Sequence, residues 1–286
     1  MAMQHWPCGL PCTGRATADT REGNMDQRFE ALQQQLQQHQ AVAVAFSGGA
    51  DSTLLLAAAR DTLGADHIIA LTAVTPYLVR QEIGDAVGIA TELAVRHELV
   101  EMDMPEGIET NPSDRCYRCK RAMYLLLLRK AEEMGFQILL DGSNINDVDD
   151  YRPGLEATRD LGIGSPFIAC GIDKALIRDV SMELGLPTWR KPTNACLLTR
   201  LRFNQRVSMD QLQQIEEAER FLGARGFTWV RVRCHGDLAR IEVAAEQREL
   251  LLQQAETISE SIRALGFRYV AMDLLGYQIG SMNDPR

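Results

Sequence analysis

Apolar and polar residues follow two different periods along this chain, and these periods predict strands and helices in turn. Helices are predicted where apolar residues recur every three or four positions, at residues 28–40, 53–59, 80–96, 118–135 and 174–184. Short apolar runs predict strands at residues 41–46, 67–74, 98–102 and 136–140. Strands that alternate with helices indicate a parallel sheet with helices on both faces.

The pattern changes after about Phe203. Helices are predicted there at residues 209–226 and 245–266, and strands at 228–234, 239–244 and 268–275. We therefore expect three parts: a flexible N-terminal extension (1–25), a doubly wound parallel α/β domain (26–203) and a small C-terminal α+β domain (204–286). The last domain is expected to bind substrate or to mediate oligomerisation.

Composition narrows the class of protein. The 286 residues are 45% hydrophobic and 24% charged, with a net charge of −9, which argues against a large nucleic-acid-binding surface. There is no apolar run of bilayer length and no N-terminal secretion signal, so we expect a cytoplasmic protein without membrane association. Seven cysteines in such a chain favour metal or catalytic use over a disulfide framework. Cys8 and Cys12, in the extension, are a weak metal candidate.

A glycine motif lies between the first predicted strand and the helix that follows it. Adjacent glycines let the backbone approach an anion, and the amides and dipole of a helix N-terminus favour phosphate. No lysine follows at the Walker spacing, so a lysine-assisted γ-phosphate site is not expected. The pattern SGGxDS resembles the pyrophosphate loop of enzymes that split ATP into AMP and pyrophosphate. The candidate ATP-binding residues here are Ser47, Gly48, Gly49, Asp51 and Ser52, with Asp51 also a catalytic candidate.

Three cysteines form a candidate metal site. Cys116 and Cys119 are three positions apart near the start of a predicted helix, which suits a redox pair or part of a metal site. Cys196, in a loop marked by Pro192, is their best candidate partner, and its alternative interpretation is a buried apolar cysteine. Three thiolates without a fourth favour an iron-sulfur cluster with one open iron over structural zinc.

Polar residues follow the predicted strand 136–140, at the edge of the sheet where a nucleotide should bind. Asp141, Asn144 and Asp147 could hold a ribose or Mg²⁺, which prefers oxygen ligands. A solvated acidic turn is the alternative, particularly for Asp149 and Asp150. Arg152 could clamp a phosphate or carboxylate.

Two arginines alternate with valines on the predicted strand 228–234. Arg231 and Arg233 share one face of this strand, and Glu242 on the next strand could join them. This arrangement suits either an anionic substrate site or a salt-bridge ladder on the surface.

Taken together, these blocks resemble the LarE family. The segments SGGADS, NPSDRCYRCK, DGSNINDVDDYRPG, ELGLPTWRKPTNACLLTR and VRVRCHGDLARIEV occur in this order from about residue 26 onward. The family makes the nickel-pincer nucleotide cofactor of lactate racemase. The resemblance implies the PP-loop fold (adenine nucleotide alpha hydrolase-like) and an ATP-dependent sulfur transferase.

The resemblance also implies a reaction in two steps. A carboxylate of pyridinium-3,5-biscarboxylic acid mononucleotide is adenylated, and sulfur then displaces AMP. In one branch of the family, the cysteine that matches Cys196 gives up its own sulfur; in the other, three cysteines hold a 4Fe-4S cluster. The presence of Cys116, Cys119 and Cys196 resembles the cluster branch.

Further expectations follow from the same resemblance. Arg231, Arg233 and Glu242 match the site for the substrate phosphate, and Glu219 matches a divalent-metal ligand. ATP and Mg²⁺ are the implied cofactors, and we expect a homo-oligomer. Iron-sulfur-dependent tRNA thiolation is the alternative function within the superfamily. An ammonia-using ligase would leave the three cysteines without a role, and a nucleotide-binding sensor without activity is a further alternative.

Overall fold

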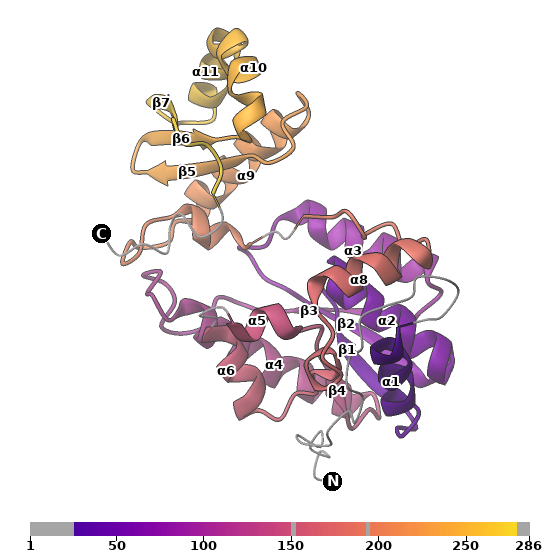
Figure 1. Ribbon diagram of the computed structural model, residues 1–286. Coiled ribbons are helices and arrows are strands. Elements are labelled where there is room, and N and C mark those ends of the chain that lie inside the picture. The colour runs from indigo at the N-terminus through magenta and orange to yellow at the C-terminus, as the bar shows by residue number, and fades with distance from the viewer. Residues whose placement is uncertain (1–25, 150–152, 193–194, 279–286) are drawn as a thin grey trace. The chain divides into compact units, whose positions relative to one another are not determined.

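The structure is a computed structural model that describes residues 26–149, 153–192 and 195–278 (Figure 1). The predicted extension with Cys8 and Cys12 lies outside these residues. Contacts within the chain divide it into two units. The first comprises residues 26–75, 80–105 and 114–192, and the second comprises 76–79, 106–113 and 195–278. The second unit thus takes in residues 195–203, which the sequence pattern assigns to the first domain.

A four-stranded parallel sheet forms the centre of the first unit. Its strand order is β3-β2-β1-β4, with all three neighbouring pairs parallel, and this confirms the predicted α/β fold. The strands are β1 (Val42–Ala45), β2 (Ile68–Val74), β3 (His97–Glu101) and β4 (Leu139–Leu140). Crossover connections that contain helices join the parallel strands, so all carboxyl ends lie at one edge of the sheet.

The helices of the first unit pack on both faces of this sheet. They are α1 (Gln27–Leu36), α2 (Ala50–Leu63), α3 (Arg80–Glu92), α4 (Arg115–Glu133), α5 (Ile145–Asp149), α6 (Pro153–Asp160), α7 (Pro166–Ala169) and α8 (Lys174–Glu183), with a short 3-10 helix η1 (Ala65–His67) before β2. The sequence did not predict α5, α6 or α7.

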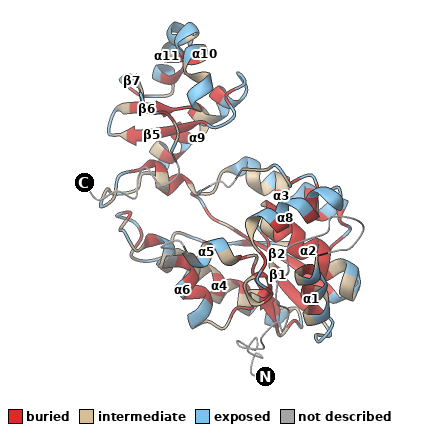
Figure 2. Cartoon of the chain, viewed as in Figure 1, coloured by how far each residue is buried: buried red, intermediate tan, exposed pale blue. Residues whose placement is uncertain are grey.

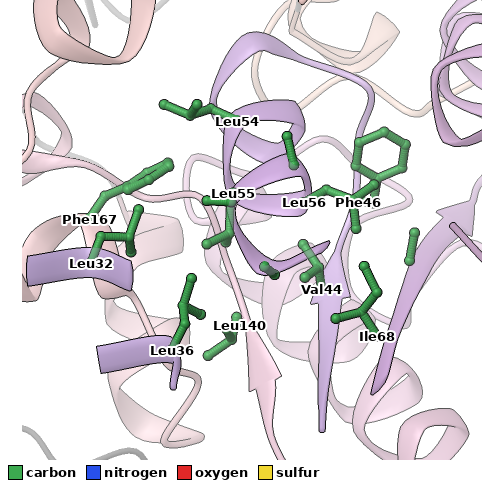
Figure 3. Packing of buried hydrophobic residues seen from close by; sticks show 14 of the residues in the cluster. Leu32, Leu36, Val44, Phe46, Leu54, Leu55, Leu56, Ile68, Leu140 and Phe167 are labelled. Atoms are coloured by element: carbon green, nitrogen blue, oxygen red, sulfur yellow. The ribbon is translucent and has the colours of Figure 1, made fainter. Parts of the chain in front are cut away.

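Alternate residues of β1 enter different hydrophobic clusters, as the period of a strand requires. Val42 and Val44 pack with residues of α1, α2, α3 and α8, including the leucines of α2 (Figure 3). Ala43 packs in the other cluster with residues of α4, such as Tyr124 and Leu127. Figure 2 shows β1 and β2, at the centre of the sheet, buried beneath these helices. The sheet is therefore covered on both faces, as predicted.

The second unit is built around a three-stranded mixed sheet. Its order is β5-β6-β7, with β5 and β6 antiparallel and β6 and β7 parallel. Its elements are η2 (Leu197–Arg200), α9 (Met209–Gly223), β5 (Arg231–His235), β6 (Leu238–Glu242), η3 (Ala245–Gln247), α10 (Arg248–Gln253), α11 (Ala255–Ala264) and β7 (Tyr269–Met272). The single helix predicted at 245–266 is wrong, because Gln254 (φ −105°, ψ 11°) separates α10 from α11.

Two segments from early in the chain complete the second unit. Asn111 is fully buried, and its side-chain amide donates to the carbonyl oxygens of Leu198, Leu201 and Arg202 at 3.2, 3.3 and 2.9 Å. The carbonyl of Tyr77 accepts a hydrogen bond from the amide of Leu197 at 2.9 Å. The loops after β2 and β3 therefore belong to the fold of the second unit. Within the described ranges, no helix combines the length and apolar character needed to cross a membrane.

Candidate active site

The glycine motif lies between β1 and α2, but α2 begins at Ala50 rather than at the predicted Thr53, so Asp51 and Ser52 lie in its first turn. Gly48 has a φ of +67°, which a glycine adopts without strain. The hydroxyls of Ser47 and Ser52 lie 3.1 Å apart, and the amide of Gly49 donates to Ser47 Oγ at 3.3 Å. Because Gly49 is the N-cap of α2 and has no side chain, it cannot cap the helix amides. The first turn of α2 can therefore bind an anion.

Both sides of this loop are closely packed against backbone. A Cβ added at Gly48 would lie 2.9 Å from the Cα of Ala86 in α3. A Cβ added at Gly142 would lie 3.0 Å from the amide nitrogen of Ser52. The absence of a side chain at these glycines thus brings α3 and the segment after β4 against the loop.

Two lysines that are distant in sequence lie beside the loop. Lys174 Nζ is 2.5 Å from both carboxylate oxygens of Asp51. Lys191 Nζ donates to Asp85 Oδ2 at 2.8 Å and to Gly48 O at 3.1 Å. Burial alone would raise the pKa of Asp85, but hydrogen bonds from Lys191 and Gln81 outweigh it and lower that pKa. The loop therefore has nearby cations without a Walker lysine.

The sequence analysis missed both lysines, because no local motif marks them. The one available signal is the position of Lys174 as the first residue of a helix in a parallel α/β domain. Helices of such domains usually begin at the edge of the sheet where ligands bind. Lys191 has no comparable local signal.

The carboxylate of Asp141 anchors the segment after β4. Asp141 is 4% exposed and accepts hydrogen bonds from Tyr124 Oη at 2.7 Å, Ser143 Oγ at 2.6 Å and Ser165 Oγ at 2.6 Å. Burial, reinforced by the charge of Asp141, raises the pKa of Tyr124 well above its usual value. Lys120 Nζ lies 3.6 Å from Asp141 Oδ2. These contacts hold the segment after β4 in place from inside the protein.

Asn144 is similarly built into the segment. It is 2% exposed, and its main-chain amide donates to Asp147 Oδ2 at 3.0 Å. Its side-chain Oδ1 accepts from the main-chain amide of Asn146 at 3.1 Å. The structure places α5 directly after Asn144, a helix that the sequence pattern did not predict. Asp150 and Arg152 lie outside the described residues, and so does the side chain of Asp149.

Cys116 and Cys119 lie in the first turn of α4. The sequence placed them just before a helix, but α4 begins at Arg115 and includes both. A separation of three residues puts their side chains on the same side of the helix. Cys116 is exposed and Cys119 is half-buried. Their role as ligands of one metal centre stays a prediction.

Cys196 lies in the second unit, immediately before η2, and is half-buried. Its convergence with Cys116 and Cys119, which lie in the first unit, stays a prediction. Among the described residues, no cysteine forms a disulfide and no group of three or more His, Cys, Asp or Glu side chains could hold a metal ion. Cys170 and Cys234 are buried, as expected for core residues.

The predicted arginine strand is β5, and it is buried on both faces. Arg233 donates to Glu242 Oε2 through Nε at 3.0 Å and Nη2 at 2.8 Å, and Arg240 donates to Glu242 Oε1 at 2.8 Å. Glu242 is 1% exposed. A surface salt-bridge ladder is therefore excluded for Arg233 and Glu242, because this ion pair is internal.

Arg231 lies among charged side chains of both signs. Its guanidinium is 5.2 Å from the centroid of the Tyr277 ring, and Nη1 donates to Val230 O at 2.8 Å. Burial lowers the pKa of Arg231 and the charges of Arg200 and Arg233 lower it further, while Glu219 offsets part of this repulsion. An anion bound here would offset this repulsion.

Glu219 is held by hydrogen bonds on both carboxylate oxygens. Oε1 accepts from Arg200 Nε at 2.9 Å and from the amide of Val232 at 2.9 Å, and Oε2 accepts from Arg200 Nη2 at 3.0 Å. These contacts do not fit the divalent-metal role implied by the resemblance. Arg200, which the sequence analysis noted only as a cation near Cys196, is the centre of this arrangement.

Comparison with known proteins places the chain in a family, although no family model matches it. It is 36% identical over 247 residues to the pyridinium-3,5-bisthiocarboxylic acid mononucleotide synthase of Lactiplantibacillus plantarum, a match that covers 86% of this chain and 90% of that protein. It is 37% identical over 264 residues to an uncharacterised protein of Synechocystis sp., covering 91% and 98% of the two chains.

A third relative shares a shorter region. The tRNA 2-thiolation protein NcsA of Haloferax volcanii is 34% identical over 121 residues, or 38% of each chain. The extended matches, the parallel α/β fold and the glycine loop agree with one another. The chain belongs to the LarE family of PP-loop, ATP-dependent sulfur transferases.

Proposed function

We propose that this protein adenylates a carboxylate of pyridinium-3,5-biscarboxylic acid mononucleotide and then replaces AMP with sulfur, as a step of nickel-pincer nucleotide biosynthesis. The observation that carries this proposal is the similarity to the Lactiplantibacillus plantarum synthase over 86% of the chain. That relative is named for the bisthiocarboxylic acid mononucleotide, which would be the product of sulfur insertion into both carboxylates.

In the first step, the carboxylate of the substrate attacks the α-phosphorus of ATP and pyrophosphate leaves. The amides at the start of α2 would hold the leaving pyrophosphate. Lys174 and Lys191 would add positive charge by exchanging Asp51 and Asp85 for phosphate oxygens. Mg²⁺ needs only one or two carboxylates when phosphates supply its other ligands, and Asp51 fits that need.

In the same proposal, Arg231 binds the phosphate of the mononucleotide. Burial lowers its pKa, as do the charges of Arg200 and Arg233, and a bound phosphate would counter these effects. Arg233, already bound to Glu242, would support the strand and contribute its charge. Arg231→Ala is expected to weaken mononucleotide binding by about 1.5–3 kcal/mol, the usual value of a charge-assisted contact.

In the second step, sulfur attacks the acyl carbon and AMP leaves. A 4Fe-4S cluster is the proposed sulfur carrier, and it is supported by Cys116 and Cys119 lying three residues apart in α4 and by the half-buried position of Cys196 before η2. These three thiolates would hold it, and when bound it would supply a transferable sulfide on its open iron. The alternative is that Cys196 gives up its own sulfur.

The test separates the two steps. With ATP and the mononucleotide, the wild-type protein is expected to form AMP and pyrophosphate, and Asp51→Ala is expected to form neither. Formation of ADP and phosphate would refute the proposed adenylation. Cys116→Ala, Cys119→Ala and Cys196→Ala are each expected to keep pyrophosphate formation but to lose the thiocarboxylate product.

Iron content decides between the two sulfur sources. Protein reconstituted without oxygen is expected to bind about four irons per chain. If Cys116→Ala remains active, and mass spectrometry after one turnover shows that Cys196 has lost the elements of hydrogen sulfide, the cluster is excluded in favour of the sacrificial cysteine.

The alternative function, tRNA thiolation, is favoured by one observation, the partial similarity to NcsA. The same pyrophosphate assay distinguishes it. Bulk tRNA is expected not to stimulate pyrophosphate formation, whereas the mononucleotide is. Stimulation by tRNA alone would support the alternative.

A further inference from the structure

Arg200 is a fully buried cation at the end of η2, with 1% of its surface exposed. Through Nη1 it donates to the main-chain carbonyls of Ala195 at 2.6 Å and Cys196 at 3.1 Å, and to Thr199 Oγ1 at 2.9 Å. Nε and Nη2 form a paired interaction with the carboxylate of Glu219. Burying a guanidinium is costly unless its donors are satisfied, and here two of the acceptors are carbonyls of the segment that carries the candidate sulfur site.

The same segment is fixed to β5 through two separate connections. In the first, Glu219 links Arg200 to the strand by accepting from the amide of Val232 at 2.9 Å. In the second, Arg233 Nη1 donates to the carbonyl of Thr199 at 2.9 Å, while Thr199 Oγ1 donates to the carbonyl of Cys196 at 2.8 Å. Figure 1 shows the two elements involved, α9 and β5, next to each other in the second unit.

We infer that Arg200 and Glu219 are positioning residues, which hold the backbone of Cys196 at a fixed place relative to the arginines of β5. The inference rests on the proposed function, in which Cys196 takes part in sulfur transfer and Arg231 binds the substrate. Arg200 acts through main-chain carbonyls. A reacting group displaced by about 1 Å can lose on the order of a hundredfold in rate, so the placement of this segment matters for the second step.

Conservative variants that keep the approximate size of each side chain test this role: Arg200→Lys retains the buried positive charge, whereas Glu219→Gln removes the carboxylate charge. Arg200→Lys keeps the charge but loses the planar fork that reaches Glu219 and the carbonyls together. Glu219→Gln replaces one acceptor oxygen with an amide donor that faces Arg200 Nη2. We expect kcat for thiocarboxylate formation to fall about a hundredfold in each variant, with pyrophosphate formation and the KM for the mononucleotide unchanged. Arg220→Ala, which removes an exposed partner of Glu217 on the same helix, is the control and should match the wild type.

Hydrogen exchange gives a readout that does not depend on activity or on a bound cluster. In cluster-free Arg200→Lys, amides of residues 195–201 are expected to exchange faster than in the wild type, while those of β5 are unchanged. Faster exchange throughout the second unit, or an equal loss of pyrophosphate formation and sulfur transfer, would show a role in general stability and would overturn the inference. Unchanged sulfur transfer in both variants would overturn it too.

The inference and the proposed function fail in different ways. If Cys196→Ala still makes the thiocarboxylate product, the proposed role of Cys196 is wrong, whatever the Arg200 variants do. If Cys196→Ala is inactive but both positioning variants transfer sulfur normally, only the inference is wrong.

Discussion

Replacing Gly48 by alanine should damage the nucleotide loop more than its backbone conformation alone explains. An alanine at φ +67° costs about 1–2 kcal/mol, because its Cβ crowds the neighbouring carbonyl. The new Cβ would also lie 2.9 Å from the Cα of Ala86, whereas carbon atoms in contact are normally about 3.5–4.0 Å apart. Relieving such overpacking costs about a further 1–3 kcal/mol. The total expected loss in the free energy of unfolding is therefore about 2–5 kcal/mol.

Gly171 provides a matched control for the conformational part of this cost. It has the same φ of +67°, but a Cβ built there meets no atom within 4 Å. Gly171→Ala should therefore lose only about 1–2 kcal/mol, as measured by urea denaturation. Because the obstacle to Gly48→Ala is main-chain Cα, the second-site change Ala86→Gly should not restore it.

The functional consequence is measured as pyrophosphate formation from ATP and the mononucleotide. Gly48→Ala must displace either the loop or α3, and we expect pyrophosphate formation to fall on the order of a hundredfold, with Gly171→Ala close to wild type. If the two alanine variants lose equal stability and form pyrophosphate equally fast, the assigned role of the close approach to Ala86 is refuted.

Three further predictions concern buried or partly buried charges. Lys174→Ala should slow pyrophosphate formation about ten- to a hundredfold by removing one charge-assisted phosphate contact, whereas Lys130→Ala, on the surface of α4, should have no such effect. Arg233→Ala should reduce stability by about 3–5 kcal/mol in thermal unfolding, because it leaves the carboxylate of Glu242 buried without its main partner. Burial lowers the pKa of His97. As the pH falls below about 6.5, this histidine is therefore protonated in the unfolded chain before it is protonated in the folded chain. The stability this provides is present above about pH 6.5 and is lost as the pH falls towards the lowered pKa, a loss that His97→Asn should reduce.

Each of these has a clear contrary result. Equal activity of the two lysine variants would remove Lys174 from the phosphate site. An Arg233→Ala protein that unfolds at the wild-type temperature would mean that Arg240 alone satisfies the carboxylate of Glu242. For His97, denaturation curves with the same pH dependence in variant and wild type would show that other groups govern the acid sensitivity.

The regular elements could be predicted because their residue patterns are local. The strand predicted at 67–74 is observed as Ile68–Val74, since its apolar residues are buried on both faces. The strand predicted at 136–140 is shorter, because Phe136 belongs to the turn that follows α4: its amide donates to the carbonyl of Ala131. Short helices such as α5, with five residues, have too few turns to show a period.

The candidate site could be predicted only where its functional residues are neighbours in the sequence. The glycine loop identifies itself by residue order alone. Lys174 and Lys191 reach it through the tertiary fold, and the ion pairs that place them join residues 123 and 106 positions apart. The role of Arg200 depends likewise on Glu219 in another helix. Long-range pairs of this kind leave no periodic signal in a single sequence.

The segments 76–79 and 106–113 determine when the second unit can fold and whether it can be produced as a separate fragment. They are synthesised before most of the first unit is complete, yet they fold with residues that follow position 195. A fragment that begins at 195 would lack Asn111 and would leave the carbonyls of Leu198, Leu201 and Arg202 without that donor. The second unit is therefore not a module that could be cut off or fused at a single point. Its assembly must wait for the whole chain.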